Sequence, residues 1–428
     1  MKESATSKLE AITNRTLVVG IDIAKKIHWA QAVDYRGIPI GKAVRFSNDK
    51  KGFELILATI EQICKERELE SAIVGVEPTG PYWKALAYWL REHGVQVTGV
   101  NTHHTKQAKC LDDNSPTKND RKDALVIARL VKDGRYFCPY LPEGVYAELR
   151  VASVARIGLI RRLNAVKNRI IGFLDEYFPE YASVFKCPLR GKASSHLLRS
   201  CPLPEDVIRL GEEGVLAEIR KAVKKTVGKK KAGELVQAAK SSIGVRQGLL
   251  GARMRIAALL AEHEFLSIQL NDVKAEMERL LGETCHQELL LGIKGVGVVT
   301  AASFLGQVGD PLRFQNARQI CRLAGYNLTE ESSGQSKSRT HISKRGRKDL
   351  RNLLYQMAYV MVAVNPEMKR LYQYFIRRRE NPLARKQALV VISKKVITVI
   401  YQILKTGKSY KTELVLGERR QEQIRLAA

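Results

Sequence analysis

Short apolar runs alternate with amphipathic stretches over the first third of the chain. Runs rich in Val, Ile and Ala predict strands at 17–23, 28–34, 41–46, 72–77 and 95–100. Helical periodicity predicts helices at 51–67 and 82–93. This order is typical of an α/β domain that opens with an antiparallel meander and continues into parallel strand-helix units. We place that domain at residues 15–140.

Beyond residue 142 the strand pattern disappears and helical periodicity takes over. Two apolar series recur alternately every four and three residues: Leu159, Leu163, Val166, Ile170 and Phe173, then Leu266, Leu270, Val273, Met277 and Leu280. Such spacing is typical of an antiparallel coiled-coil pair, but ordinary amphipathic helices packed on a core share it. We place a coiled-coil region at 145–285.

Three further segments complete the α/β plus all-α organisation. A lysine-rich insert at about 179–240 has the composition of a loop or a small helical element, and its lysines form either a solvated face or a nucleic acid contact. Residues 286–406 are predicted as a helical C-terminal domain with Gly-rich turns, and 407–428 as a polar tail.

The net charge narrows the choice of partner. The chain has 72 Lys and Arg against 44 Asp and Glu, a net charge of +28, while its 45% hydrophobic content is that of a folded protein. A surplus of this size favours binding to nucleic acid. There is no run of about 18 apolar residues and no signal-peptide pattern, so we expect a cytoplasmic protein without a membrane partner. Seven scattered cysteines without a C-x-x-C pair predict reduced core thiols rather than a zinc site or disulfides.

Four acids in the first domain form a candidate metal site. Asp22 and Glu77 each lie at the end of an apolar strand, where an unpartnered buried charge is costly. Asp120 and Asp123 are three apart in a predicted helix, on one helical face. Oxygen ligands suit Mg²⁺, and two such ions can clamp a phosphodiester, so the four acids predict two Mg²⁺ ions, with Mn²⁺ able to substitute. Any one acid, Asp120 above all, can instead be a cap or an ion-pair partner.

Glycines and basic residues mark two candidate nucleic acid contacts in the C-terminal domain. The segment Lys294-Gly295-Val296-Gly297 precedes a predicted helix, an arrangement similar to the helix-hairpin-helix element, although the glycines also suit close helix packing. The second contact is a run with seven basic residues and one acid, Asp349. Its basic residues are Lys337, Arg339, Lys344, Arg345, Arg347, Lys348 and Arg351.

A doubled serine lies just before this basic run. Ser332 and Ser333 precede Gly334, which leaves the backbone free to bring a hydroxyl close to a ligand. A serine there could attack a phosphodiester with cationic groups stabilising the developing charge. Taken alone, Ser-Ser-Gly is an ordinary turn sequence.

Together these segments resemble a known family, the DEDD-type insertion-sequence transposases. VVGIDIAK, GVEPTG and SPTKNDRKDA are similar to that family's RuvC-like domain, which has the RNase H fold. GIKGVGVVTA, RLAGYN, SSGQS and HISKRGRKDLRNLLYQMA are similar to its C-terminal transposase domain. The resemblance covers most of the chain apart from the insert and both tails.

The resemblance implies a mechanism and a set of partners. Asp22, Glu77, Asp120 and Asp123 of one subunit would bind Mg²⁺, and a serine of a second subunit would form a 5′-phosphoserine link with DNA. Matching the family's Ser-Gly step favours Ser333, with Ser332 as the alternative. Double-stranded DNA of the element ends and target, a structured noncoding bridge RNA, and a homodimer or homotetramer are the implied partners, in a prokaryotic, nucleoid-associated setting.

Two other functions use parts of the same pattern. A metal-dependent DNA nuclease or Holliday-junction resolvase would keep the four acids and use water in place of serine. An architectural nucleic acid binder would have acids with a purely structural role. Covalent protein-DNA adducts separate the transposase from the nuclease, and Mg²⁺-dependent activity separates both from the binder.

Overall fold

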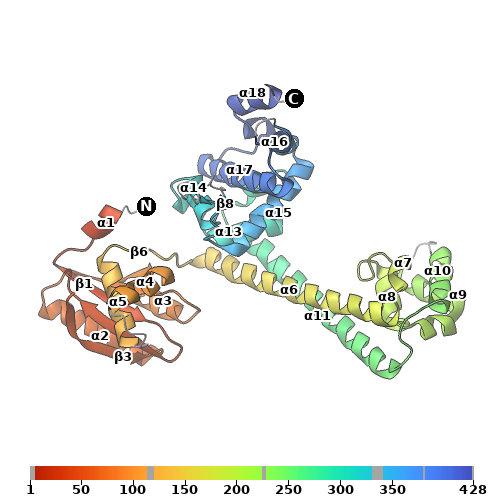
Figure 1. The fold of residues 1–428 in the computed structure, drawn as a ribbon, viewed down its shortest axis with the longest axis horizontal. Helices are drawn as coiled ribbons and strands as arrows, with labels where there is room; N and C mark the ends of the chain where they lie inside the picture. Colours follow the sequence, from red (N-terminus) through yellow and green to blue (C-terminus); the bar gives the residue numbers. More distant parts are fainter. Residues whose placement is uncertain (1–4, 113–119, 224–227, 330–340, 379–380, 427–428) are drawn as a thin grey trace, which may run out of the picture. The chain divides into compact units, whose positions relative to one another are not determined.

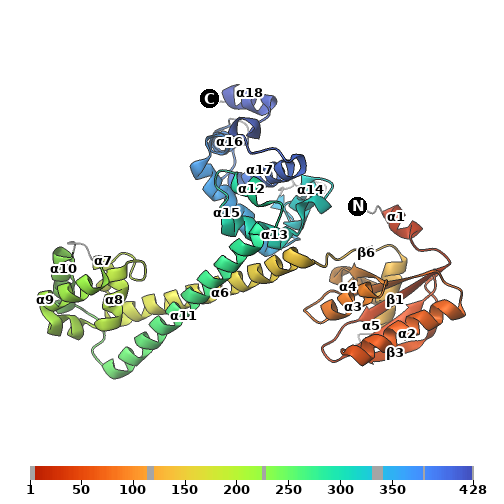
Figure 2. The ribbon, with the colours of Figure 1, turned by 180° about the vertical axis from the view of Figure 1, so that it is seen from behind.

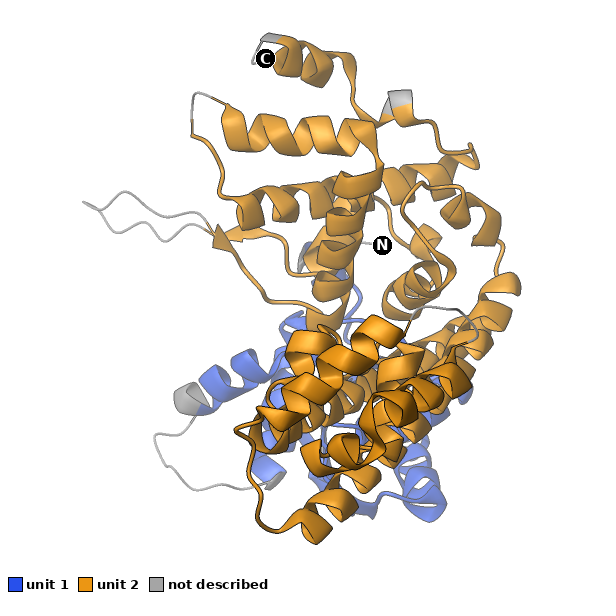
Figure 3. Cartoon of the chain, turned by 90° about the vertical axis from the view of Figure 1, so that its right-hand side faces the viewer, with its two compact units in different colours: residues 1–141 blue, residues 142–428 orange. Residues whose placement is uncertain are grey.

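A computed structural model of the chain describes residues 5–112, 120–223, 228–329, 341–378 and 381–426. The chain divides into two compact units, residues 1–141 and 142–428 (Figure 3). Each unit is described by itself below. Both Ser332 and Ser333, together with Lys337 and Arg339, lie outside the described residues.

A six-stranded sheet with the order β3-β2-β1-β4-β5-β6 forms the centre of the first unit. Its strands are β1 (Thr16–Asp22), β2 (Ile27–Val33), β3 (Pro39–Ser47), β4 (Ser71–Val76), β5 (Gln96–Val100) and β6 (Tyr136–Phe137). Strands β1, β2 and β3 form an antiparallel meander, while β1, β4 and β5 are parallel and β6 is antiparallel. The predicted meander with parallel units is confirmed.

Helices cover both faces of this sheet. They are α1 (Ala5–Glu10), α2 (Lys50–Glu66), α3 (Trp83–Glu92), α4 (Thr102–Asp112) and α5 (Asp120–Lys132). Leu17, Val19 and Ile21 of β1 belong to the core formed with α2 and α3, whereas Val18 belongs to the core formed with α5. Figures 1 and 2, taken from opposite sides, show α2 and α5 on opposite faces. Because side chains alternate along a strand, Asp22 points to the α5 face.

Two long helices, α6 (Gly144–Tyr177) and α11 (Leu249–Gly282), lie side by side in the second unit (Figure 1). Ion pairs join Arg169 to Glu262 at 3.1 Å and Arg255 to Glu176 at 2.7 Å. A later residue of α6 thus pairs with an earlier residue of α11, so the two helices run antiparallel. Most seam residues predicted above are buried in the clusters to which this pair contributes: Leu163, Val166, Ile170, Phe173, Leu266, Leu270, Met277 and Leu280. Supercoiling of the pair stays a prediction.

The segment between these helices is helical. It contains α7 (Tyr181–Val184), α8 (Lys192–Ser200), α9 (Pro204–Ala222) and α10 (Lys229–Lys240). Their apolar side chains, Tyr181 and Leu197 among them, share a core with the adjoining ends of α6 and α11. Of the two expectations for the insert, the small helical element is the one observed.

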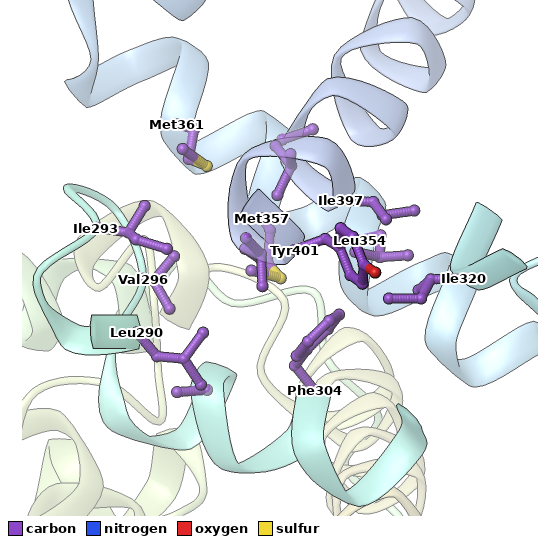
Figure 4. Close-up of a cluster of buried hydrophobic side chains, with 14 of the residues drawn as sticks. Leu290, Ile293, Val296, Phe304, Ile320, Leu354, Met357, Met361, Ile397 and Tyr401 are labelled. Carbon is purple, nitrogen blue, oxygen red and sulfur yellow. The ribbon is translucent and has the colours of Figure 1, made fainter. Parts of the chain in front are cut away.

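The rest of the second unit is a helical bundle. It contains α12 (Gln287–Leu291), α13 (Val298–Val308), η1 (Pro311–Arg313), α14 (Ala317–Leu323), β7 (Leu328–Thr329), β8 (His341–Ile342), α15 (Lys348–Val364), α16 (Pro366–Arg377), α17 (Arg385–Thr406), η2 (Thr412–Val415) and α18 (Glu418–Leu426). Helix α13 is buried on all sides from Ala301 to Val308, as expected of a central helix. Figure 4 shows Phe304 of α13, Met357 of α15 and Tyr401 of α17 converging in one core.

Three details differ from the expectations or refine them. The tail predicted as polar contributes Val415 and Leu416 to the core. Cys138, Cys187 and Cys285 are exposed, so the prediction of core thiols is wrong for these three; the cysteines described with their side chains form no disulfide. Helix α17 is long and apolar enough to cross a membrane, but more than half of its apolar window is buried in the bundle.

Candidate functional site

Asp22 and Glu77 lie beside each other at the ends of two parallel strands. Strands β1 and β4 pair in register, with Gly20 opposite Gly75 and Ile21 opposite Val76. One step further along the chain places Asp22 next to Glu77, on strands that run about 4.8 Å apart. Both carboxylates follow their glycine by two residues, so both point to the face covered by α5.

The two glycines let α5 lie directly on these strands. A Cβ atom at Gly20 would lie 2.1 Å from the carbonyl oxygen of Ala124 and 2.3 Å from the backbone nitrogen of Ala128. At Gly75 it would lie 2.3 Å from the side chain of Val131. Any larger residue at Gly20 would therefore push the α5 backbone away from the sheet.

This close approach brings Asp123 to the same end of the sheet. Asp123 is only 8% exposed, and its carboxylate accepts a 2.6 Å contact from the Lys109 ammonium on α4. Burial raises the pKa of Glu77; the Lys109 charge and a Thr105 hydrogen bond oppose that rise, and the Asp123 charge adds to it. The effect of Asp123 on the pKa of Glu77 shows that the two carboxyl groups are electrostatic neighbours.

The fourth predicted acid is described only in part. Asp120 is the first residue of α5, one helical turn before Asp123, and its side chain lies outside the described part of the chain. Among the side chains that the structure describes, no group of three or more His, Cys, Asp and Glu could hold a metal ion. The donor chemistry nevertheless suits a hard cation, because Asp22, Glu77 and Asp123 are all carboxylates at one end of the sheet, and a cation, the Lys109 ammonium, already pairs with Asp123.

Sequence reasoning missed α4 and its two polar side chains, Thr105 and Lys109. The helix has a polar sequence, THHTKQAKCLD, without a clear apolar stripe, so periodicity gave no signal for it. Polar residues that follow a predicted parallel strand were the available clue, since the carboxyl ends of such strands form binding edges.

The two short strands that flank the candidate serines in the sequence pair with each other. Strands β7 and β8 pair Leu328 with Ile342 and Thr329 with His341. Residues 330–340, which lie between them in the sequence, are outside the described residues. Next to this strand pair, a Cβ atom on Gly346 would lie 2.5 Å from the nitrogen of Gly325. The segment just before β7 and the segment just after β8 therefore pack closely against each other.

The basic residues of this region fall into two groups. Lys344, Arg345 and Lys348 are exposed. Arg351 donates to the carbonyl oxygens of Ala324 at 2.9 Å and Lys344 at 3.2 Å, and Arg347 donates to that of Gln307. Arg347 and Arg351 therefore bond to the backbone of their own chain near β7 and β8. Contact of these five basic residues with nucleic acid stays a prediction.

The glycine turn before α13 adopts a backbone that requires glycine. Gly295 has φ +100°, and a Cβ atom there would lie 3.1 Å from Met361 and Val364. Lys294 and Gly297 are exposed on the turn that joins α12 to α13. The close contact of Gly295 with α15 agrees with the helix-packing alternative, and a helix-hairpin-helix role in DNA binding stays a prediction.

Comparison with known proteins identifies related sequences along most of the chain. A family model for DEDD transposases of the IS110 type matches residues 19–179, and one for the IS116/IS110/IS902 transposase family matches 287–373. The chain is 25% identical over 415 residues to the 44.8 kDa protein of insertion element IS116 from Streptomyces clavuligerus (92% of this chain, 95% of that protein). It is 29% identical over 395 residues to the pilin gene-inverting protein of Moraxella bovis (92% and 97%).

A match over a shorter part of the chain is to a protein that is named as a transposase. The chain is 31% identical over 108 residues to the transposase for insertion sequence element IS1328 of Yersinia enterocolitica, which covers 25% of this chain and 32% of that protein. The four acids lie inside the first family match, and Lys294 to Arg351 lie inside the second. Residues 180–286, which include α7 to α11, lie outside both.

Proposed function

The chain belongs to the IS116/IS110/IS902 family of insertion-sequence transposases, and on that premise we propose that it cuts DNA with an acidic metal site and a serine nucleophile. Members of this family are enzymes that cleave DNA and transfer its strands. DNA is accordingly the substrate class. The identity of the reacting groups is the proposal.

The acidic site consists of Asp22, Glu77, Asp120 and Asp123. The observation that supports it most strongly is the register of β1 and β4, which ends both strands in carboxylates on the face covered by α5. Mg²⁺ held by these carboxylates would stabilise negative charge on the phosphodiester. Lys109 must release Asp123 when a cation binds, because both compete for the same carboxylate oxygen.

The nucleophile is assigned to Ser333, with Ser332 as the alternative. The serine oxygen attacks phosphorus and forms an ester, the bond to the 3′ oxygen breaks, and that oxygen takes a proton to leave as a 3′ hydroxyl. Rejoining reverses the step, with a 3′ hydroxyl displacing the serine. The support is the resemblance of the SSGQS segment to the family's serine and its place just before the basic run that begins at Lys337.

A guide RNA and a second protein chain complete the proposal. The net charge of +28 suits a protein that holds DNA and a structured bridge RNA together. A partner chain is supported by apolar side chains that stay exposed on α11, where Leu250, Met254, Phe265 and Ile268 are each more than half exposed. A homodimer or homotetramer would cover them and would let the acids of one chain act with the serine of another.

The acidic site is tested by strand cleavage with matched binding measurements. Asp22→Asn, Glu77→Gln and Asp123→Asn should each lower cleavage by at least about a hundredfold while DNA affinity is kept. Asp133→Asn, a change of the same kind at an exposed acid just after α5, should leave cleavage unchanged. Cleavage retained in Asp22→Asn, or lost equally in Asp133→Asn, would contradict the assignment.

A further inference from the structure

A cavity of about 570 Å³ opens in the second unit between α6, α13 and α15. Carboxamide side chains face it from all three helices: Asn164 of α6, Gln307 of α13, and Asn352 and Gln356 of α15. Apolar side chains, including Ile160 and Leu353, complete the lining. The volume and the mixture of apolar surface with a few convergent polar groups are those of a small-ligand site.

Two polar atoms in this lining are buried without a partner. Neither Nε of Arg156 nor the hydroxyl of Ser303 has a hydrogen-bond partner within the described part of the chain. They belong to two different helices that line the cavity, Arg156 to α6 and Ser303 to α13. Buried polar atoms are normally paired, so these two indicate that the cavity accommodates a ligand with hydrogen-bonding atoms.

The charge of the lining favours an anionic ligand. Asp349 is the single acid among the described residues that line the cavity, and it pairs with Arg161 at 3.0 Å. Arg150 lies just behind the lining and donates to Gln307 at 2.8 Å. Arg156 therefore contributes a positive charge that Asp349 does not neutralise. Burial lowers the pKa of its guanidinium, because the charged form is less stable away from water.

We propose that this cavity binds one nucleotide lifted out of a nucleic acid strand. The phosphate would be held by Arg156, the edge of the base by the carboxamides, and the face of the base by Ile160 and Leu353. Asn and Gln side chains pair with base edges through two hydrogen bonds, and extrahelical bases are commonly read in such pockets. This proposal rests on the proposed function for its ligand class, nucleic acid, but it uses residues other than the four acids and the two serines.

The test places the fluorescent base 2-aminopurine at successive positions of DNA duplexes and of the element's flanking RNA, bound to the full-length protein. Unstacking at one position should raise fluorescence there and nowhere else, in DNA or in RNA, and the strand that responds identifies the source. Arg156→Met and Asn352→Leu should each reduce the position-specific signal roughly tenfold. Gln402→Leu, a matched change at an exposed carboxamide of α17, should not.

Two further measurements distinguish failure of the pocket proposal from failure of the proposed function. Circular dichroism first verifies that each variant is folded, and strand cleavage is measured on the same samples. A position-specific signal that depends on Arg156 and Asn352 supports the pocket even if cleavage fails. Equal fluorescence at every position in DNA and in RNA, or a signal that both pocket variants retain, overturns the inference even if cleavage is normal.

Discussion

Gly20→Ala tests how closely α5 approaches the sheet. The added Cβ would lie 2.1 Å from the Ala124 carbonyl oxygen, whereas an ordinary contact needs at least 3.4 Å, so α5 must move by about 1.3 Å. Overpacking against backbone costs about 3 kcal/mol of the free energy of unfolding. Asp123 adjoins Ala124, and a displacement of about 1 Å costs roughly a hundredfold in rate, so cleavage should fall by that factor.

The chain allows this cost to be measured on the first unit alone. All three tryptophans, Trp29, Trp83 and Trp89, lie in residues 1–141, so tryptophan fluorescence follows unfolding of that unit within the full-length protein. With a urea slope of about 2 kcal/mol/M, the midpoint should fall by roughly 1.5 M.

A matched control also adds one heavy atom. Ala85→Ser changes an exposed position of α3 in the same unit and should leave the urea midpoint and cleavage unchanged. A Gly20→Ala variant with the stability and cleavage rate of the parent protein would refute the close packing of α5 on β1.

Three other predictions use separate parts of the structure. Lys109→Met removes the cation that competes for Asp123, so Mn²⁺ should bind about fivefold more tightly in calorimetry; unchanged or weaker binding would argue against a cation site there. Lys344→Ala should weaken DNA binding and lower the number of ions released on binding, measured from its salt dependence, by about one. Arg351→Ala should lower cleavage and leave that salt dependence nearly unchanged, because Arg351 donates to carbonyl oxygens of its own chain. The reverse pattern would show that Arg351 contacts DNA and Lys344 does not. Burial acts to raise the pKa of Glu180, but hydrogen bonds from the Ser242 hydroxyl and the Ile243 backbone N–H outweigh it and hold the pKa below its ordinary value. This carboxylate therefore stabilises the fold above its ordinary pKa, and the stabilisation is lost as the pH falls through the lower folded-state pKa. Glu180→Gln should flatten this acid-side loss, measured by hydrogen exchange of α10, and an unaltered pH profile would contradict the prediction.

Much of the first unit could be predicted because its signals are local. A buried parallel strand reads as a continuous apolar run, so an acid at the end of such a run is conspicuous, as at Asp22 and Glu77. The register that places Gly20 opposite Gly75 depends on which strands pair, and spacing along the chain does not contain it. The same limit explains why Lys109 was missed: its partner Asp123 is reached only when α4 and α5 come together in the fold.

Composition was less informative in the second unit. A run of basic residues predicts an anion-binding surface, but it does not distinguish Lys344, which is exposed, from Arg351, which donates to two carbonyl oxygens of its own chain. The nucleotide-sized cavity assembles side chains from three helices that are distant in sequence, among them Arg156, Ser303 and Asn352. Each of these residues looks unremarkable in its own segment.

The most direct test of the proposed mechanism is capture of a covalent protein-DNA adduct. Purified protein is incubated with Mg²⁺, the element's flanking RNA and labelled junction DNA, and the products are separated under denaturing conditions and mapped by peptide sequencing. The mechanism predicts DNA linked to Ser333, lost in Ser333→Ala and in Asp22→Asn but kept in Ser332→Ala. Cleavage with no adduct at either serine would contradict it and would make the protein a metal-dependent nuclease that uses water.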